Sequence, residues 1–206
     1  MSQVAYLPSG KREQTKLQNR AAILDAAREV FGELGYEAST VRDIIRRTGL
    51  AAGTFYNYYR SKEEVFAALA DEGARKFQPI LKAERAKAAD FESFVRSAIR
   101  AYFRYLADEH ANWVARRPPD EAMPHVRTET PEGQAVFAEV RDAIVAESRR
   151  GGPSADPDYL AAACIAIARE VGEKMLQRRP VDIDGAAEFA MTMILGGVRS
   201  LPGAEG

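Results

Sequence analysis

Hydrophobic positions recur at intervals of three and four along most of the chain, the spacing of an amphipathic helix. The first such stretch runs from Leu17 to Leu34, and Gly35 follows as a helix end. The same spacing recurs in five later stretches, at residues 61–87, 90–109, 131–150, 157–178 and 183–200. No stretch shows the alternation of apolar and polar residues that is typical of a strand. The pattern therefore predicts an all-α protein.

Between the first two of these stretches, residues 40–62 read TVRDIIRRTGLAAGTFYNYYRSK. Thr40 with Asp43 forms a capping box, so a helix is expected to begin near Val41. Gly49 is expected to end this helix, because a residue just past a helix commonly adopts a left-handed backbone. A tight turn and a second short helix then follow.

The second short helix has a composition that helix propensity does not explain. Gly53 costs about 1 kcal/mol relative to alanine inside a helix, and aromatic residues crowd the positions after it. A small residue allows close approach to DNA, hydroxyl groups bind phosphates, and Asn57 offers a paired donor and acceptor to a base edge. The composition suits a helix that enters the major groove.

The run GLAAGTFYNYYRSKEEVF resembles the helix-turn-helix core of the tetracycline-repressor (TetR) family of bacterial transcriptional regulators. Ala51 departs from the family pattern, which usually has a serine there to cap the recognition helix. The resemblance reaches upstream to about Leu17 and covers roughly the first third of the chain. The matching positions are Gly49, Leu50, Gly53, Thr54, Phe55, Tyr56, Tyr59, Ser61, Lys62 and Glu63.

The resemblance implies a helix-turn-helix DNA-binding domain at residues 15–62, after a flexible basic arm at 1–14. Residues 63–206 would form a helical domain for effector binding and dimerisation. The charge distribution agrees, because residues 1–62 carry 10 Lys and Arg against 6 Asp and Glu, whereas the remainder carries 19 against 24. A basic segment on an acidic body is typical of proteins that touch DNA with one domain.

The resemblance also implies two kinds of DNA contact. Phosphates would be bound by Thr40, Thr54, Tyr56, Tyr58 and Lys62, and base edges would face Ala52, Gly53 and Asn57. Phe55 and Tyr59 are expected in the core. A dimer would span half-sites about 34 to 36 Å apart, so the expected operator is a pseudo-palindrome.

The resemblance implies that the second domain binds a small-molecule effector, and the expected site lies around the widely apolar helix at 90–109. The hypothesis is an apolar ligand, with an anionic group as an option, and the candidate residues are Phe94, Tyr102, Trp113, Phe137, Arg141 and Arg169. A short helix carrying Trp113 and a proline-rich loop would follow the central helix. Upstream, Pro79 predicts either a hinge or a break near Gln78.

The last two helices are rich in Ala, Gly and Met, and small residues let helices approach closely. Together with the resemblance, this favours a homodimer formed through these helices, although packing within one chain would give a similar composition.

Enzyme chemistry finds no support in the motifs. His110 and His125 lack metal-ligand spacing, Cys164 is the single cysteine, and no nucleophile or phosphate-loop motif occurs. We therefore expect no catalytic residue, metal or cofactor. No apolar run is long enough to span a membrane, so a cytoplasmic protein is expected. The predicted function is a ligand-responsive transcriptional regulator of repressor type; the alternative is a constitutive DNA-binding architectural protein without effector response.

Overall fold

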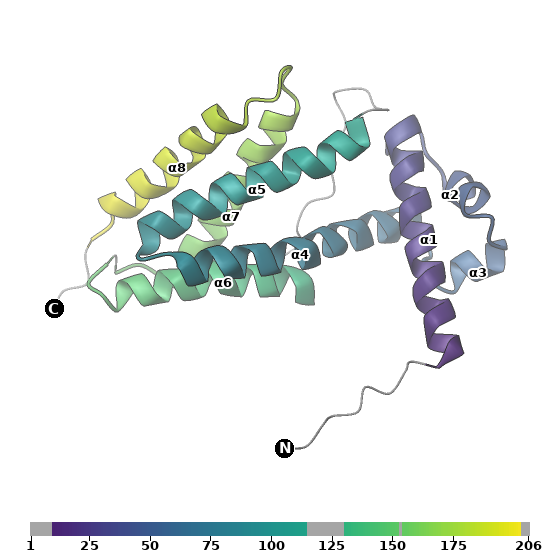
Figure 1. The fold of residues 1–206 in the computed structure, drawn as a ribbon, viewed down its shortest axis with the longest axis horizontal. Helices are drawn as coiled ribbons and strands as arrows, with labels where there is room; N and C mark the ends of the chain where they lie inside the picture. The colour runs from purple at the N-terminus through teal and green to yellow at the C-terminus, as the bar shows by residue number, and fades with distance from the viewer. Residues whose placement is uncertain (1–9, 115–129, 153, 203–206) are drawn as a thin grey trace. The chain divides into compact units, whose positions relative to one another are not determined.

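The computed structural model describes residues 10–114, 130–152 and 154–202, and within these ranges the chain forms eight helices and no strand (Figure 1). The predicted all-α class is confirmed. The helices are α1 (Lys11–Leu34), α2 (Val41–Thr48), α3 (Ala52–Tyr56), α4 (Lys62–Lys87), α5 (Phe91–Val114), α6 (Pro131–Ser148), α7 (Pro157–Leu176) and α8 (Ile183–Ser200).

The chain divides into two compact units inside α4: an N-terminal unit, residues 1–68, and a C-terminal unit, residues 69–206. This division lies six residues beyond the domain boundary expected from the sequence, because the first two turns of α4 pack with the N-terminal unit. Phe66 on α4 contacts the rings of Phe31 and Tyr36, at centroid distances of 5.8 and 4.6 Å.

The N-terminal unit is built around α1, which packs against α2. Ile23 and Phe31 of α1, Ile44 of α2 and Phe55 of α3 are fully buried. Leu17 and Leu34, the two ends of the predicted apolar face, are exposed. The helix therefore contributes its middle to the core and extends beyond it at both ends.

The expected arm at residues 1–14 is wrong for its last four residues, which belong to α1. Residues 11–18 are all exposed, so this part of the helix carries no apolar pattern from which a start could be predicted. Its backbone is nevertheless helical, since Gln14 N–H donates to the Gly10 carbonyl. Residues 1–9 lie outside the described residues.

The predicted caps of α2 are confirmed. The Thr40 hydroxyl accepts from the Asp43 backbone N–H, and the Asp43 carboxylate accepts from the Thr40 backbone N–H. Gly49 ends the helix with φ of 68°, a conformation that glycine adopts most easily. Asp43 is an acceptor for the Thr40 hydroxyl as well, which lowers the pKa of its carboxyl group.

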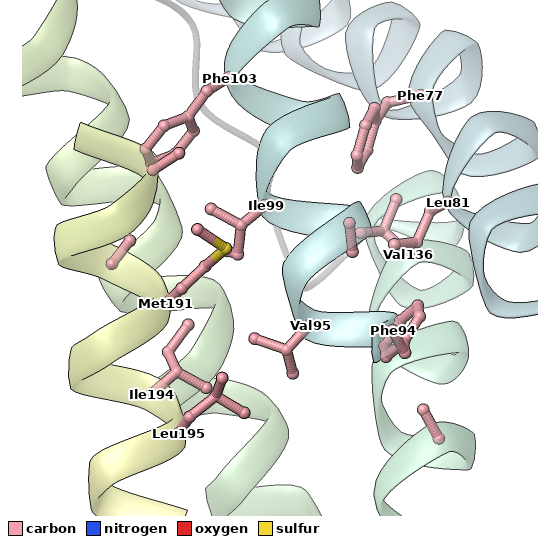
Figure 2. Close-up of a cluster of buried hydrophobic side chains, with 14 of the residues drawn as sticks. Phe77, Leu81, Phe94, Val95, Ile99, Phe103, Val136, Met191, Ile194 and Leu195 are labelled. Atoms are coloured by element: carbon pink, nitrogen blue, oxygen red, sulfur yellow. The ribbon is translucent and has the colours of Figure 1, made fainter. Parts of the chain in front are cut away.

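The C-terminal unit is organised around α5, which packs against α6, α7 and α8. Figure 2 shows Val95 and Ile99 of α5 pointing toward Met191 of α8. Phe94 points away from α8, toward the side of α5 where Val136 lies. Asp90 and Ser93 cap the start of α5, where the Ser93 N–H donates to the Asp90 carboxylate at 2.8 Å. The prediction that this helix is central to its domain is confirmed.

Two expected interruptions are absent from the described helices. The sequence predicts a separate short helix carrying Trp113, but α5 continues unbroken to Val114, because neither proline nor glycine occurs between His110 and Val114. A helix break near Gln78 is also excluded, since α4 runs through Pro79 to Lys87. Phe77 and Leu81 on either side of Pro79 are buried, and their packing offsets the lost backbone hydrogen bond.

Candidate DNA-binding surface and effector cavity

Helix α3 is short, and it presents one buried anchor and several exposed side chains. Phe55 is 0 % exposed, whereas Tyr56 is 56 % exposed and Ala52, Gly53 and Asn57 are exposed beside it. Ala51 occupies the N-cap position and makes no side-chain cap. The Thr54 N–H donates to the Ala51 carbonyl at 2.9 Å, and the N–H groups of Ala52 and Gly53 remain available to an external acceptor such as a phosphate.

Gly53 has no structural reason within the chain to be glycine. A Cβ atom built on it would meet no heavy atom within 4 Å, and its backbone is helical. The open space lies on the exposed side of α3, where a small residue allows another molecule to approach the backbone closely. This is the property expected of a helix that enters a groove.

Asn57 is the C-cap of α3, and Tyr58 and Tyr59 lie in the turn that follows. Two side chains of α1 hold this turn: Asn19 Nδ2 donates to Tyr58 Oη at 3.4 Å, and Arg20 Nε donates to Tyr59 Oη at 3.2 Å. Tyr59 is buried, as predicted, and Tyr58 is half-buried. The Tyr58 hydroxyl accepts this bond and keeps its own proton for an external acceptor.

Two of the predicted phosphate ligands are engaged inside the N-terminal unit. The Lys62 ammonium donates to the carbonyls of Tyr36, Glu37 and Ser39 at 2.8, 3.2 and 3.3 Å, and lies 4.4 Å from the centre of the Tyr36 ring. These three bonds use all of its N–H donors. The Thr40 hydroxyl is likewise occupied by Asp43.

Three exposed arginines of the N-terminal unit are absent from the predicted DNA-binding residues: Arg42, Arg46 and Arg60. Within the described residues, the side chains of Arg42 and Arg60 have no recorded hydrogen bond or ion pair, and Arg46 lies 3.6 Å from Asp43. Arg47 differs, because it binds Glu29 and Glu33 of α1 at 2.8 and 2.5 Å. The positive charge of Arg42, Arg46 and Arg60 is evident from the sequence. The bonds that occupy Lys62 and Arg47 within the N-terminal unit are not, because they depend on the fold.

The C-terminal unit contains a cavity of about 80 Å³ that opens to solvent. All five helices of the unit contribute to its wall. The lining residues are Phe77, Leu81, Phe91, Phe94, Val95, Ala98, Ile99, Tyr102, Val136, Val140, Cys164, Ile165, Ala168, Arg169 and Ile194. Most of these side chains are apolar, so the cavity suits a hydrophobic ligand.

Three of the six predicted ligand-binding residues line this cavity: Phe94, Tyr102 and Arg169. Phe137 packs against the core but is outside the lining. Arg141 is exposed and donates to Asp158 at 2.5 Å. The side chain of Trp113 and the predicted loop around residues 118–124 lie outside the described part of the chain.

Polar groups in the cavity are few. Burial raises the pKa of Tyr102 to about 12, although the charge of Arg169 acts in the opposite direction. Burial also raises the pKa of the Cys164 thiol to about 11, which keeps it protonated at neutral pH. Arg169 donates from Nε and Nη2 to the same oxygen of Glu170, at 3.1 and 2.9 Å.

Two absences among the described residues concern metal binding and membrane insertion. No group of three or more His, Cys, Asp or Glu side chains among them could hold a metal ion. None of the helices in the same part of the chain is long and apolar enough to cross a membrane.

Residues 23–69 match the model of a family described as bacterial regulatory proteins, tetR family. The fatty acid metabolism regulator protein of Bacillus subtilis (strain 168) is 33 % identical over 88 residues, which are 43 % of this chain and 45 % of that protein. The HTH-type transcriptional repressor ComR of Escherichia coli (strain K12) is 34 % identical over 99 residues, 47 % of this chain and 45 % of that protein. The match therefore spans less than half the length of each of these relatives.

Among solved structures, the transcriptional regulator FadR of Bacillus subtilis in complex with stearoyl-CoA is similar over most of its length. The TM-score is 0.65 at 20 % identity, and the match covers 86 % of this chain and 98 % of that one. At this identity the likeness establishes the fold, including that of the C-terminal unit.

Proposed function

We propose that this chain, whose N-terminal unit belongs to the tetR family of bacterial regulatory proteins, is a DNA-binding transcriptional regulator of repressor type. The observation that carries the proposal is the exposed side of α3, where Gly53 leaves its backbone open and the buried Phe55 fixes the helix to the core. Base edges would face Ala52, Gly53 and Asn57. A protein with this role acts where the DNA is, in the cytoplasm.

Phosphate contacts are assigned by the availability of donors. Thr54, Tyr56 and Tyr58 keep hydroxyl protons beside the exposed side of α3, and the exposed Arg42 and Arg60 supply charge. Lys62 and Thr40 support this surface from within, because their polar groups bind the chain itself. The two arginines therefore take the electrostatic role that the family resemblance implies for Lys62.

The C-terminal unit is proposed to bind a hydrophobic small-molecule effector in its cavity. The support is the apolar wall formed by five helices, together with the stearoyl-CoA complex of a regulator of the same fold. An architectural DNA-binding protein without effector response has no need for such a cavity. Effector binding would change DNA affinity by favouring one arrangement of the protein over another.

We further propose a homodimer formed through α7 and α8. Tyr159, Phe189 and Met193 are apolar side chains exposed by 79, 58 and 52 %, and they lie on these two helices. Gly196 and Gly197 on α8 are exposed too, and a Cβ atom on either would meet nothing within 4 Å. An apolar helix surface with small residues suits close packing against a second copy.

The function is tested by incubating the purified chain with a pool of random DNA duplexes at two salt concentrations and sequencing what is retained. Recovery of a salt-sensitive inverted repeat is the expected result. Salt-sensitive retention without a shared sequence would favour an architectural protein. If nothing is retained at low salt, the proposed function is wrong.

A further inference from the structure

The cavity of the C-terminal unit is polar at one place only. Of its lining residues, Arg169 alone carries a formal charge, and Tyr102 alone carries a hydroxyl group. A Cβ atom on Gly172 of α7, three residues after Arg169, would meet Phe103 and Leu106 of α5. The charge of Arg169 also acts on the Tyr102 hydroxyl, so the two side chains face each other from α7 and α5. The two polar groups are therefore neighbours and not opposite ends of the cavity.

The remainder of the wall extends away from these groups along α5. Phe91 and Tyr102 both line the cavity and are 11 positions apart, so it extends roughly 16 Å along the helix at about 1.5 Å per residue. The α5 residues between them that reach the cavity are Phe94, Val95, Ala98 and Ile99, all apolar. A ligand that fills it needs an elongated apolar body with a polar group at one end.

Tyr102 and Arg169 both have hydrogen-bond donors to spare. No hydrogen bond of the Tyr102 hydroxyl is recorded within the described residues, and its ring is fixed by Phe77 and Phe103 at centroid distances of 5.1 and 6.0 Å. Arg169 uses two of its five N–H groups on one oxygen of Glu170. Neither side chain can accept a proton at neutral pH, so the pair favours an acceptor of negative charge.

We infer that the cavity binds a monocarboxylate, with its apolar body along α5 and its carboxylate accepting hydrogen bonds from Tyr102 Oη and Arg169. This inference rests on the proposed effector function and assigns its ligand class. A carboxylate has two acceptor oxygens and matches both donors, whereas a primary alcohol of equal length matches neither the charge nor the geometry. A cationic head would be repelled by Arg169.

The test uses the purified full chain and isothermal titration calorimetry without DNA. The probes are the even-numbered saturated carboxylates from hexanoate to tetradecanoate below their micelle concentrations, with the primary alcohol and methyl ester of each length. We expect at least one acid to bind about tenfold or more tightly than its alcohol and ester, since bonds to charged groups are roughly twice as strong as neutral ones. Arg169→Gln should remove this preference, and Tyr102→Phe should reduce it.

Arg141→Gln is the matched control, because Arg141 is an arginine of the same unit that lies outside the cavity lining. It should keep the preference for the acid. Equal affinity for acid, alcohol and ester in the unaltered chain would overturn the inference, as would a preference that survives Arg169→Gln, or the absence of binding by every probe. A methyl ester that binds as tightly as the acid would overturn the inference as well, because the negative charge is then not recognised.

Retention of DNA by the same proteins separates this inference from the proposed function. If the chain binds the acids but retains no DNA, the regulatory function fails while the cavity assignment stands. If it retains an inverted repeat but binds none of the probes, the cavity assignment fails and the DNA-binding function stands. Retention of DNA by Arg169→Gln also shows that this variant folds.

Discussion

At the scale of single residues, the exposed side of α3 depends on Gly53, which has no side chain to cover the backbone. Gly53 and Gly49 are both open to solvent, but they are glycine for different reasons. Gly49 has φ of 68°, so the local backbone requires it, whereas Gly53 is in an ordinary helical conformation. Substitution at the two positions therefore separates folding from DNA binding.

We expect Gly53→Ala to leave the stability of the chain unchanged or to raise it by up to about 1 kcal/mol, since alanine favours a helix. The same change should weaken binding to the selected operator by about fivefold or more, because a methyl group then occupies the approach to the bases. Thermal unfolding and fluorescence anisotropy with labelled operator measure the two effects. Gly49→Ala is the control and should lower stability by about 1 kcal/mol. Unchanged operator affinity in Gly53→Ala would contradict the assignment of this surface.

Lys62 and Arg42 provide a second contrast at this scale. Lys62→Met removes three bonds to carbonyls, so it should lower the free energy of unfolding of the N-terminal unit by about 1 to 3 kcal/mol. Arg42→Met removes an exposed charge with no recorded partner in the described chain, so it should leave stability almost unchanged. On DNA, Arg42→Met should reduce the slope of log affinity against log salt by about one, whereas Lys62→Met should preserve the slope.

Urea unfolding and operator binding at four salt concentrations decide between these roles. If Lys62→Met reduces the slope of log affinity against log salt and leaves stability unchanged, Lys62 contacts a phosphate, as the family resemblance implies. The role of Lys62 could not be predicted from the sequence. The motif identified the residues of the DNA-binding unit, but the partner of an ammonium group depends on loop carbonyls 23 to 26 positions earlier in the chain.

At the scale of helices, the ends that carry a local signal were predictable. Capping boxes and N-terminal prolines fixed the starts of α2 and α6, and α8 was predicted at Ile183–Ser200, where it is observed. The start of α1 carries no such signal, because its first eight residues are all exposed. Continuity of α4 through Pro79 depends on packing by helices far away in the sequence. Phe94 and Tyr102 could be placed in the cavity region from the apolar pattern of their own helix. The position of Arg141 outside the cavity depends on packing between helices, so the sequence could not predict it.

Helix α4 is joined to α6 by a buried carboxylate near Pro79. Glu139 of α6 is 8 % exposed and accepts from Arg85 Nε at 2.7 Å and from Gln78 Nε2 at 3.1 Å. It is the one charged side chain in the buried set of the described residues. Since Phe77 and Leu81 of the same helix line the cavity, this contact fixes one wall of the cavity.

Arg85→Met should destabilise the C-terminal unit by about 1 to 3 kcal/mol, because it leaves a buried carboxylate without its charged partner. The value lies below that of a fully buried pair, as the Arg85 side chain is 34 % exposed. The double variant Arg85→Met with Glu139→Leu should recover part of the loss, since no buried charge then remains. Arg75→Met, which removes an exposed pair with Glu132, serves as the control and should have little effect. Chemical unfolding followed by circular dichroism measures all three; a double variant less stable than Arg85→Met would contradict this account.

At the scale of the whole molecule, the proposed operator recognition requires two copies of the chain. A single N-terminal unit carries one short recognition helix, and two copies related by a two-fold axis would read two half-sites. The apolar surface of α7 and α8 is proposed to supply this assembly, and its glycines distinguish an interface from an ordinary exposed helix. Gly172 of α7 is glycine for the fold itself, because a Cβ there would lie 2.6 Å from Leu106 Cδ1. Gly196 and Gly197 have no such neighbour within the chain.

The double variant Gly196→Ala with Gly197→Ala should therefore raise the helical stability of an isolated chain, by about 0.5 to 1 kcal/mol at each position. In the dimer, two added methyl groups at a close helix contact should cause overpacking that costs about 1 to 3 kcal/mol, and so weaken association roughly five- to 150-fold. Sedimentation equilibrium measures the dissociation constant, and footprinting on the inverted repeat should show that protection of both half-sites then requires more protein. Gly172→Ala is the opposite control, since it should lower the stability of the chain by strain at Leu106. If the double variant associates as tightly as the unaltered chain, α8 does not form the interface, and the second copy must bind another surface.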